Sequence, residues 1–139
     1  MAAKIRKVGY YSMQVSNRAG AGAGLLNALK QEGVDLLAFT GFPERGGAQV
    51  DFVPVQDAAF RRAAKRAGLR LSARKTVFLV QGEDRPGAIA AILGKLAVAK
   101  INVTALDAVA AGNDRFGAIL WVKPKDVARA ARVLGARAG

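Results

Sequence analysis

A short turn in the second half of the chain carries residue types that suit the binding of a small charged molecule. The turn follows a strand-like run at residues 76–80 and precedes an apolar-faced helix. Asp84 could bind an ammonium group, Arg85 could bind an anion, and Gly87 would let a ligand approach the backbone closely. The first N–H groups of a helix have no partner within it, so they suit a carboxylate. The same residues also fit an ordinary turn, with Asp84 as the helix N-cap and Pro86 in the first helical turn, and both interpretations stay open.

This turn and its helix occur twice in the chain. The apolar residues of the helix, from Ile89 to Leu96, recur at the spacing of an amphipathic helix, and the same pattern lies 67 residues earlier. The offset needs no gap over about 60 positions, which indicates an internal duplication. The identical pairs are Gln14/Gln81, Arg18/Arg85, Gly20/Gly87, Ala21/Ala88, Leu26/Leu93, Leu29/Leu96 and Gly68/Gly135.

Each copy has the hydrophobic pattern of a β-α-β-β-α-β unit. The predicted fold class is therefore α+β, with two ferredoxin-like units (residues 1–74 and 75–139) whose antiparallel sheets carry both helices on one face. Residues 1–7 are predicted to be a basic lead-in, and residues 69–73 the fourth strand of the first unit. The second unit has only residues 136–139 for its fourth strand, so that strand is either a stub or is completed by another part of the assembly.

The composition excludes several classes of site. The chain has no cysteine and no histidine, which rules out disulfides, thiolate or imidazole metal ligands and the usual catalytic triads. We therefore expect no metal, no cofactor and no catalysis. No apolar run reaches the roughly 18 residues of a membrane span, and the first residues lack a secretory pattern. The expected location is the cytoplasm, without membrane contact.

The net charge of +12 allows two interpretations. It could serve an anionic partner such as nucleic acid, with the basic helix at residues 57–67 and the arginine-bearing last helix as the contacts. Alternatively, the basic side chains are solvated helix faces, since they are spread over several elements.

The second copy resembles the ACT domain. Asp84-Arg85-Pro86-Gly87-Ala88-Ile89, followed by Leu93, Leu96 and Ala97 and then by Ile101-Asn102-Val103, is similar to that family's D-R-P-G-x-L, L-A and G-I-N-I pattern. Lys100 replaces the usual glycine before the second strand. The first copy keeps that glycine as Gly33, but Asn17 and Ala19 replace the aspartate and the proline. The resemblance covers nearly the whole chain as two tandem units.

The resemblance implies a regulatory protein that binds a small molecule, usually an amino acid. In the family, units pair side by side into an eight-stranded sheet, and effectors lie between units, in contact with the first turn and the second strand. Asn102 and Asp35 begin that strand in the two copies, where each could contact a ligand or simply start the strand. The implied ligand-binding residues are Asp84, Arg85, Pro86, Gly87, Ala88, Asn102 and Val103 in the second copy, and Asn17, Arg18, Ala19, Gly20, Ala21, Asp35 and Leu36 in the first.

The leading hypothesis is a stand-alone amino-acid sensor without catalysis. Its partners would be the effector, a second copy of the chain as a homodimer, or a regulated protein. The alternatives are a basic nucleic-acid-binding module and a purely structural subunit that assembles through open sheet edges.

Overall fold

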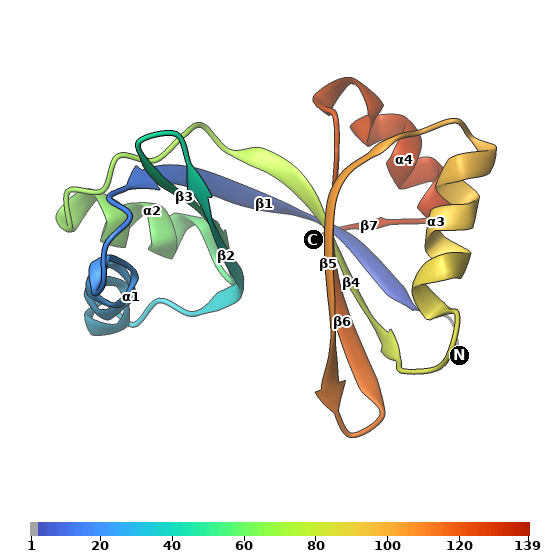
Figure 1. The fold of residues 1–139 in the computed structure, drawn as a ribbon, viewed down its shortest axis with the longest axis horizontal. Coiled ribbons are helices and arrows are strands. Elements are labelled where there is room, and N and C mark those ends of the chain that lie inside the picture. The colour runs from blue at the N-terminus through green and yellow to red at the C-terminus, as the bar shows by residue number, and fades with distance from the viewer. Residues whose placement is uncertain (1–2) are drawn as a thin grey trace. The chain divides into compact units, whose positions relative to one another are not determined.

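A computed structural model describes residues 3–139, and the chain folds into two units of the same α+β type (Figure 1). Both follow the predicted β-α-β-β-α order, so the predicted fold class is confirmed. The elements in chain order are β1 (Lys4–Val15), α1 (Ala21–Gln31), β2 (Leu36–Glu44), β3 (Gly47–Pro54), α2 (Asp57–Arg66), β4 (Lys75–Glu83), α3 (Ala88–Val98), β5 (Val103–Gly112), β6 (Arg115–Val122), a 3₁₀ turn (Pro124–Asp126), α4 (Val127–Leu134) and β7 (Arg137–Ala138).

Strand β1 contributes to both units. The N-terminal unit is Gly9–Lys75, and the C-terminal unit contains Thr76–Gly139 together with the start of β1 through Val8. The predicted lead-in at residues 1–7 is therefore wrong from Lys4 onward, because β1 begins there and Ile5 packs into the C-terminal core. Residues 1 and 2 lie outside the described residues. The units thus differ from the predicted boundaries at the N-terminus.

The N-terminal unit packs its two helices on one face of a sheet with the strand order β2-β3-β1. Leu25 and Leu29 of α1 and Phe60 of α2 contribute to a core with Tyr11 and Phe52 of the sheet. The ring centroids of Tyr11 and Phe60 lie 5.2 Å apart, and those of Phe52 and Phe60 lie 5.3 Å apart, as expected for tilted aromatic pairs.

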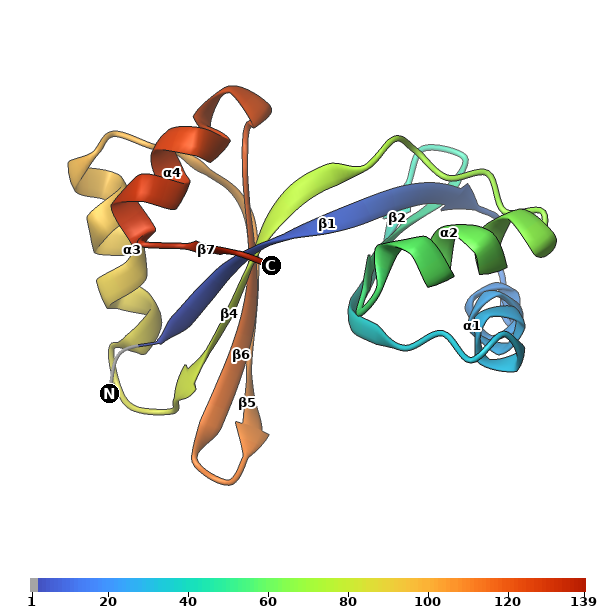
Figure 2. The same ribbon diagram turned by 180° about the vertical axis from the view of Figure 1, so that it is seen from behind.

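The C-terminal unit has the strand order β1-β4-β6-β5, with β7 paired to β1. Helices α3 and α4 lie side by side on one face of this sheet (Figure 2). Ile92 and Leu96 of α3 and Leu134 of α4 bury their side chains against Phe78 and Leu120 of the strands. None of the helices in residues 3–139 combines the length and the apolar character that crossing a membrane requires.

The N-terminal unit ends its sheet differently from the predicted pattern, whereas the C-terminal unit has the short fourth strand that the sequence predicts. The fourth strand predicted at residues 69–73 is wrong, since no strand forms there. Ser72 donates its N–H to the Ser12 carbonyl (2.9 Å), but the Ser12 N–H bonds to the Ser72 hydroxyl instead of a carbonyl (2.9 Å), so no regular ladder develops. In the C-terminal unit β7 has two residues and pairs in parallel with β1 through Arg6 and Arg137. The place beside β4 is taken by β1.

The prediction that the two copies align at an offset of 67 without a gap is wrong in the β5–β6 hairpin. Tyr11 lies opposite Phe52, and its counterpart Phe78 lies opposite Leu120, which shifts the offset from 67 to 68. An extra residue in β5, at a register shift between Ala110 and Gly112, absorbs the difference. Without the shift, every side chain of β6 would point to the opposite face.

Candidate functional site

The turn after β4 is fixed by backbone hydrogen bonds. The Asp84 N–H donates to the Asp114 carbonyl (2.8 Å), and the Ala88 N–H donates to the Arg85 carbonyl (3.2 Å). Gly87 is the N-cap of α3, with φ 84° and ψ 3°, and no side chain caps the helix. The interpretation with Asp84 as N-cap and Pro86 in the first helical turn is therefore wrong. Only a residue without a Cβ adopts this backbone conformation readily.

The first turn of α3 exposes unused donors. The Ala91 N–H donates to the Gly87 carbonyl (3.0 Å). Within residues 3–139, no acceptor is recorded for the N–H groups of Ile89 and Ala90. Such donors lie at the positive end of the helix dipole and favour an anion.

A pocket of about 350 Å³ opens between this helix start and the end of β5. Asp84 lines it, is exposed, and has no recorded side-chain partner among the described residues. The pocket thus combines a carboxylate with unused N–H groups. Its lining is Asp84, Arg85, Gly87, Ala88, Ile89, Ala90, Ala108, Val109, Ala110 and Phe116.

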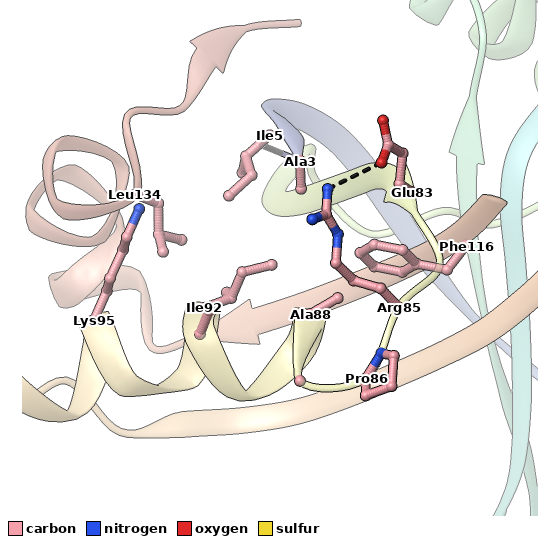
Figure 3. A pocket seen from close by; sticks show the side chains of 12 residues that line it. Ala3, Ile5, Glu83, Arg85, Pro86, Ala88, Ile92, Lys95, Phe116 and Leu134 are labelled. Atoms are coloured by element: carbon pink, nitrogen blue, oxygen red, sulfur yellow. Dashed lines mark hydrogen bonds and ion pairs between the residues drawn. The ribbon is translucent and has the colours of Figure 1, made fainter. Parts of the chain in front are cut away.

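Arg85 forms an ion pair with Glu83. Its Nη2 lies 2.9 Å from Oε2 of Glu83, and both side chains are about half exposed (53% and 46%). The pair borders a second pocket of about 500 Å³ on the other side of α3, against β1 and α4 (Figure 3). Arg85 therefore lines both pockets, and an anion at Arg85 would have to compete with Glu83.

Asn102 and Val103 lie at the other end of the same unit. Val103 pairs with Val122 on β6, whereas Glu83, next to the turn, pairs with Arg115. These β6 positions are seven residues apart, which is about 23 Å along a strand. Within the unit, one small ligand does not reach both sets.

The strand residues that do line the pocket are the last ones of β5, and the sequence analysis missed them. The turn residues Gly112, Asn113 and Asp114 in the sequence could have identified Ala108, Val109 and Ala110. A tight hairpin places the end of β5 beside the start of β6. The start of β6 also pairs with the end of β4, next to the turn.

The turn of the first copy has the same backbone as the second. Gly20 is the N-cap of α1 with φ 89° and ψ −15°, and the Ala21 N–H donates to the Arg18 carbonyl (3.3 Å). The N–H groups of Gly22 and Ala23 likewise have no recorded acceptor in residues 3–139. Asn17 and Ala19 occupy the positions of Asp84 and Pro86, and all four side chains are exposed.

Asp35 and Leu36 lie away from that turn. The Asp35 carboxylate accepts the Leu36 N–H (2.9 Å), so the side chain is used to start β2. Leu36 pairs with Pro54, whereas Val15, next to the turn, pairs with Ala48. Six residues of β3 separate these positions, about 20 Å.

Comparison by sequence gives no relatives, since no family model and no curated protein matches the chain. Comparison by structure gives strong matches. A protein from Bacteroides thetaiotaomicron has a TM-score of 0.77 at 19% identity, covering 96% of this chain and 88% of its own. The regulatory subunit of aspartate kinase from Thermus thermophilus has a TM-score of 0.63 at 15% identity, covering 97% and 95%. A putative C-terminal regulatory domain of aspartate kinase from Porphyromonas gingivalis has a TM-score of 0.55 at 11% identity, covering 96% and 94%.

The chain has an ACT-like fold. The resemblance stated from the turn residues is thereby supported at the level of the fold. Among these matches, the aspartate kinase chains are described as regulatory subunits or domains rather than catalytic ones. At these identities the likeness concerns the ACT-like fold alone. Residues 3–139 hold no group of three or more acidic, His or Cys side chains that could bind a metal ion.

Proposed function

We propose that the chain is a non-catalytic regulatory module that binds a free amino acid at the turn before α3. One observation carries the proposal. Ile89 and Ala90, whose N–H groups have no recorded acceptor within residues 3–139, line the same pocket as the exposed Asp84. This combination matches the two charges that every free amino acid carries at neutral pH.

The binding mode follows from those charges. The carboxylate of the amino acid accepts hydrogen bonds from the Ile89 and Ala90 N–H groups at the start of α3. Its ammonium group binds Asp84, through a charge-assisted hydrogen bond. The side chain lies against the apolar surface of Ala108 and Val109, and the pocket of about 350 Å³ favours a small one.

The regulatory part of the proposal rests on the ACT-like fold, which the chain shares with regulatory subunits of aspartate kinase. Binding would act on a partner, either a second copy of this chain or a regulated protein. A ligand that prefers one state of that assembly shifts the population toward it by its difference in affinity. We extend the proposal to the first copy with lower affinity, because Asn17 lacks the charge of Asp84.

The nucleic-acid alternative has weaker support. On α2, Arg66 pairs with Glu32 (2.7 Å) and Arg61 donates to the Tyr11 hydroxyl (3.3 Å). Two basic side chains of α2 are therefore engaged in contacts within the N-terminal unit. Arg62 and Lys65 remain, and a steep salt dependence of RNA or DNA affinity would reveal such a role.

A thermal-shift screen against the twenty amino acids tests the proposal. A ligand that binds only the folded state stabilises it by about 2.7 kcal/mol at a hundredfold excess over its dissociation constant. We expect one or a few small amino acids to raise Tm, and Asp84→Ala to abolish the rise. No shift with any amino acid at millimolar concentration would overturn the proposal.

A further inference from the structure

A row of three polar residues crosses the middle of the N-terminal sheet. Ser12 on β1 lies directly opposite Asp51 on β3, and Asp51 lies directly opposite Thr40 on β2. Their neighbours Tyr11 and Phe52 point into the core beneath the helices. Because side chains alternate along a strand, the polar row lies on the face without helices.

Asp51 is the one charged side chain that is buried among the residues the structure describes, with 4% of its surface exposed. The Ser12 hydroxyl (2.8 Å) and the Gln49 amide (3.1 Å) both donate to the same oxygen, Oδ1. In residues 3–139 no arginine or lysine pairs with Asp51, and no donor to Oδ2 is recorded. Two neutral donors leave the charge of the carboxylate uncompensated.

Thr40 completes the row with an unused hydroxyl. Its Oγ1 is the one fully buried side-chain N or O atom in the described part of the chain that has no hydrogen-bond partner. Residues directly opposite in an antiparallel pair have Cβ atoms roughly 5 Å apart. The orphaned hydroxyl therefore belongs to the residue directly opposite Asp51, whose Oδ2 also lacks a recorded donor in the described residues.

The C-terminal unit shows that the fold does not require this row. The equivalent positions there are Leu79, Ile119 and Asp107, paired in the same register. Ile119 replaces the buried carboxylate, and Asp107 is exposed. A buried carboxylate beside an orphaned hydroxyl is thus a specific feature of the N-terminal unit, and buried unsatisfied groups of this kind call for a partner.

We propose that the polar row binds a small monovalent cation, held by Asp51 and Thr40. Carboxylate and hydroxyl oxygens are hard ligands that suit potassium, sodium or ammonium ions. A monovalent ion neutralises the single charge of Asp51, whereas a divalent ion would leave a buried net charge, which is costly. The Ser12 hydroxyl donates its proton to Asp51 and keeps lone pairs that can face the ion.

Bound in this way, the ion links three strands. Ser12, Asp51 and Thr40 come from β1, β3 and β2, so the cation stabilises the N-terminal sheet. This site is independent of the amino acid proposed for the turn before α3, which lies in the other unit. Either proposal can fail without the other.

The test is thermal unfolding of the full chain in potassium, sodium and ammonium chloride against tetramethylammonium chloride at constant ionic strength. We expect a saturable rise of Tm by about 3 °C with at least one of the small ions. Thr40→Val keeps the shape of the side chain but lacks the hydroxyl, and Asp51→Asn removes the charge, so both should abolish the rise. The matched control is Asp107→Asn in the exposed equivalent position, which should keep it.

A sodium NMR titration provides a direct readout of binding. We expect the protein to broaden the sodium signal, Thr40→Val to reduce the broadening, and potassium to compete. The same Tm in all four salts, or an ion-dependent Tm that persists in Thr40→Val, overturns the proposal. If Asp51→Asn does not fold, Thr40→Val decides the outcome alone.

Discussion

The turns of the two copies have the same backbone but different side chains. Gly20 and Gly87 adopt nearly the same left-handed conformation, with φ 89° and 84°. In both turns the helix begins with two N–H groups for which residues 3–139 offer no recorded acceptor. The duplicated feature is therefore a glycine-capped helix start with N–H groups that would suit an anion, and it depends on the glycine more than on any charged side chain.

The charge that would select an amino acid occurs in one copy alone. Asp84 is matched by the neutral Asn17 at the same distance before the helix. The comparison indicates that a carboxylate could bind at either turn, whereas an ammonium group gains a counter-charge only at the second. A second difference concerns the sheets, since β1 completes the sheet of the C-terminal unit as well as its own.

The largest expected effect tests the shared strand. Ile5 is 7% exposed and packs in the C-terminal core, although the sequence places it in the first predicted unit. Ile5→Ala should destabilise the C-terminal unit by about 2–5 kcal/mol, because it removes buried methyl groups and leaves a cavity. Hydrogen exchange should show faster opening of α3 and β6. The control is Met13→Ala, in the part of β1 that belongs to the N-terminal unit, and it should act on α1 and β3. The reverse assignment of the two variants would contradict the shared strand.

The next effect concerns the two turns. Asp84→Asn should weaken amino-acid binding about 10- to 100-fold, since a charged hydrogen bond contributes about 1.5–3 kcal/mol. Tm without ligand should stay unchanged because the Asp84 side chain is exposed and has no recorded partner in the described residues. Isothermal titration measures both affinities, with Asn17→Ala as the matched control. In the opposite direction, Asn17→Asp should raise the affinity of the first turn about 10- to 100-fold. An unchanged affinity at that turn would contradict the comparison.

A smaller effect is expected where one copy has lost a glycine. Gly33 has φ 74°, and its counterpart Lys100 has φ 59°, a left-handed conformation that costs a residue with a Cβ about 1–2 kcal/mol. Lys100→Gly should therefore raise the free energy of unfolding by about 1 kcal/mol. Gly33→Ala should lower it by a similar amount. Urea denaturation measures both, and a destabilised Lys100→Gly would show that the lysine side chain contributes more than the strain.

The smallest effect distinguishes Tyr11 from its counterpart Phe78. Burial, with the hydrogen bond and the charge of Asp57, raises the pKa of Tyr11 above its ordinary value of 10.0. The folded state thus prefers the protonated phenol. Its contribution to stability is fully present below pH 10.0 and is lost as the pH rises through the folded-state pKa. Urea midpoints between about pH 8 and pH 11 should fall less in Tyr11→Phe than in the unmodified protein, and equal slopes would contradict this assignment.

The sequence predicted the features that depend on local pattern. Helices α1 and α3 follow from apolar spacing, but the N-cap of α3 is Gly87 and not Asp84, the N-cap that the turn sequence suggested. The features that failed depend on long-range pairing. No local signal assigns Lys4 to a sheet, shifts the β5–β6 register by one residue, or replaces a carbonyl by the Ser72 hydroxyl. Nor did the sequence show which end of β5 lies beside the turn, because that follows from the register of the hairpin.

The central claim is that the turn before α3 binds an amino acid by its two charges. The most direct measurement is a ¹H–¹⁵N NMR titration of the full chain with the amino acid that gives the largest thermal shift. The account predicts the largest amide shifts at Ile89 and Ala90, smaller ones at Gly22 and Ala23, and none with the corresponding amino-acid amide, which lacks the carboxylate. Saturable binding that leaves the Ile89 and Ala90 amides unmoved would contradict it.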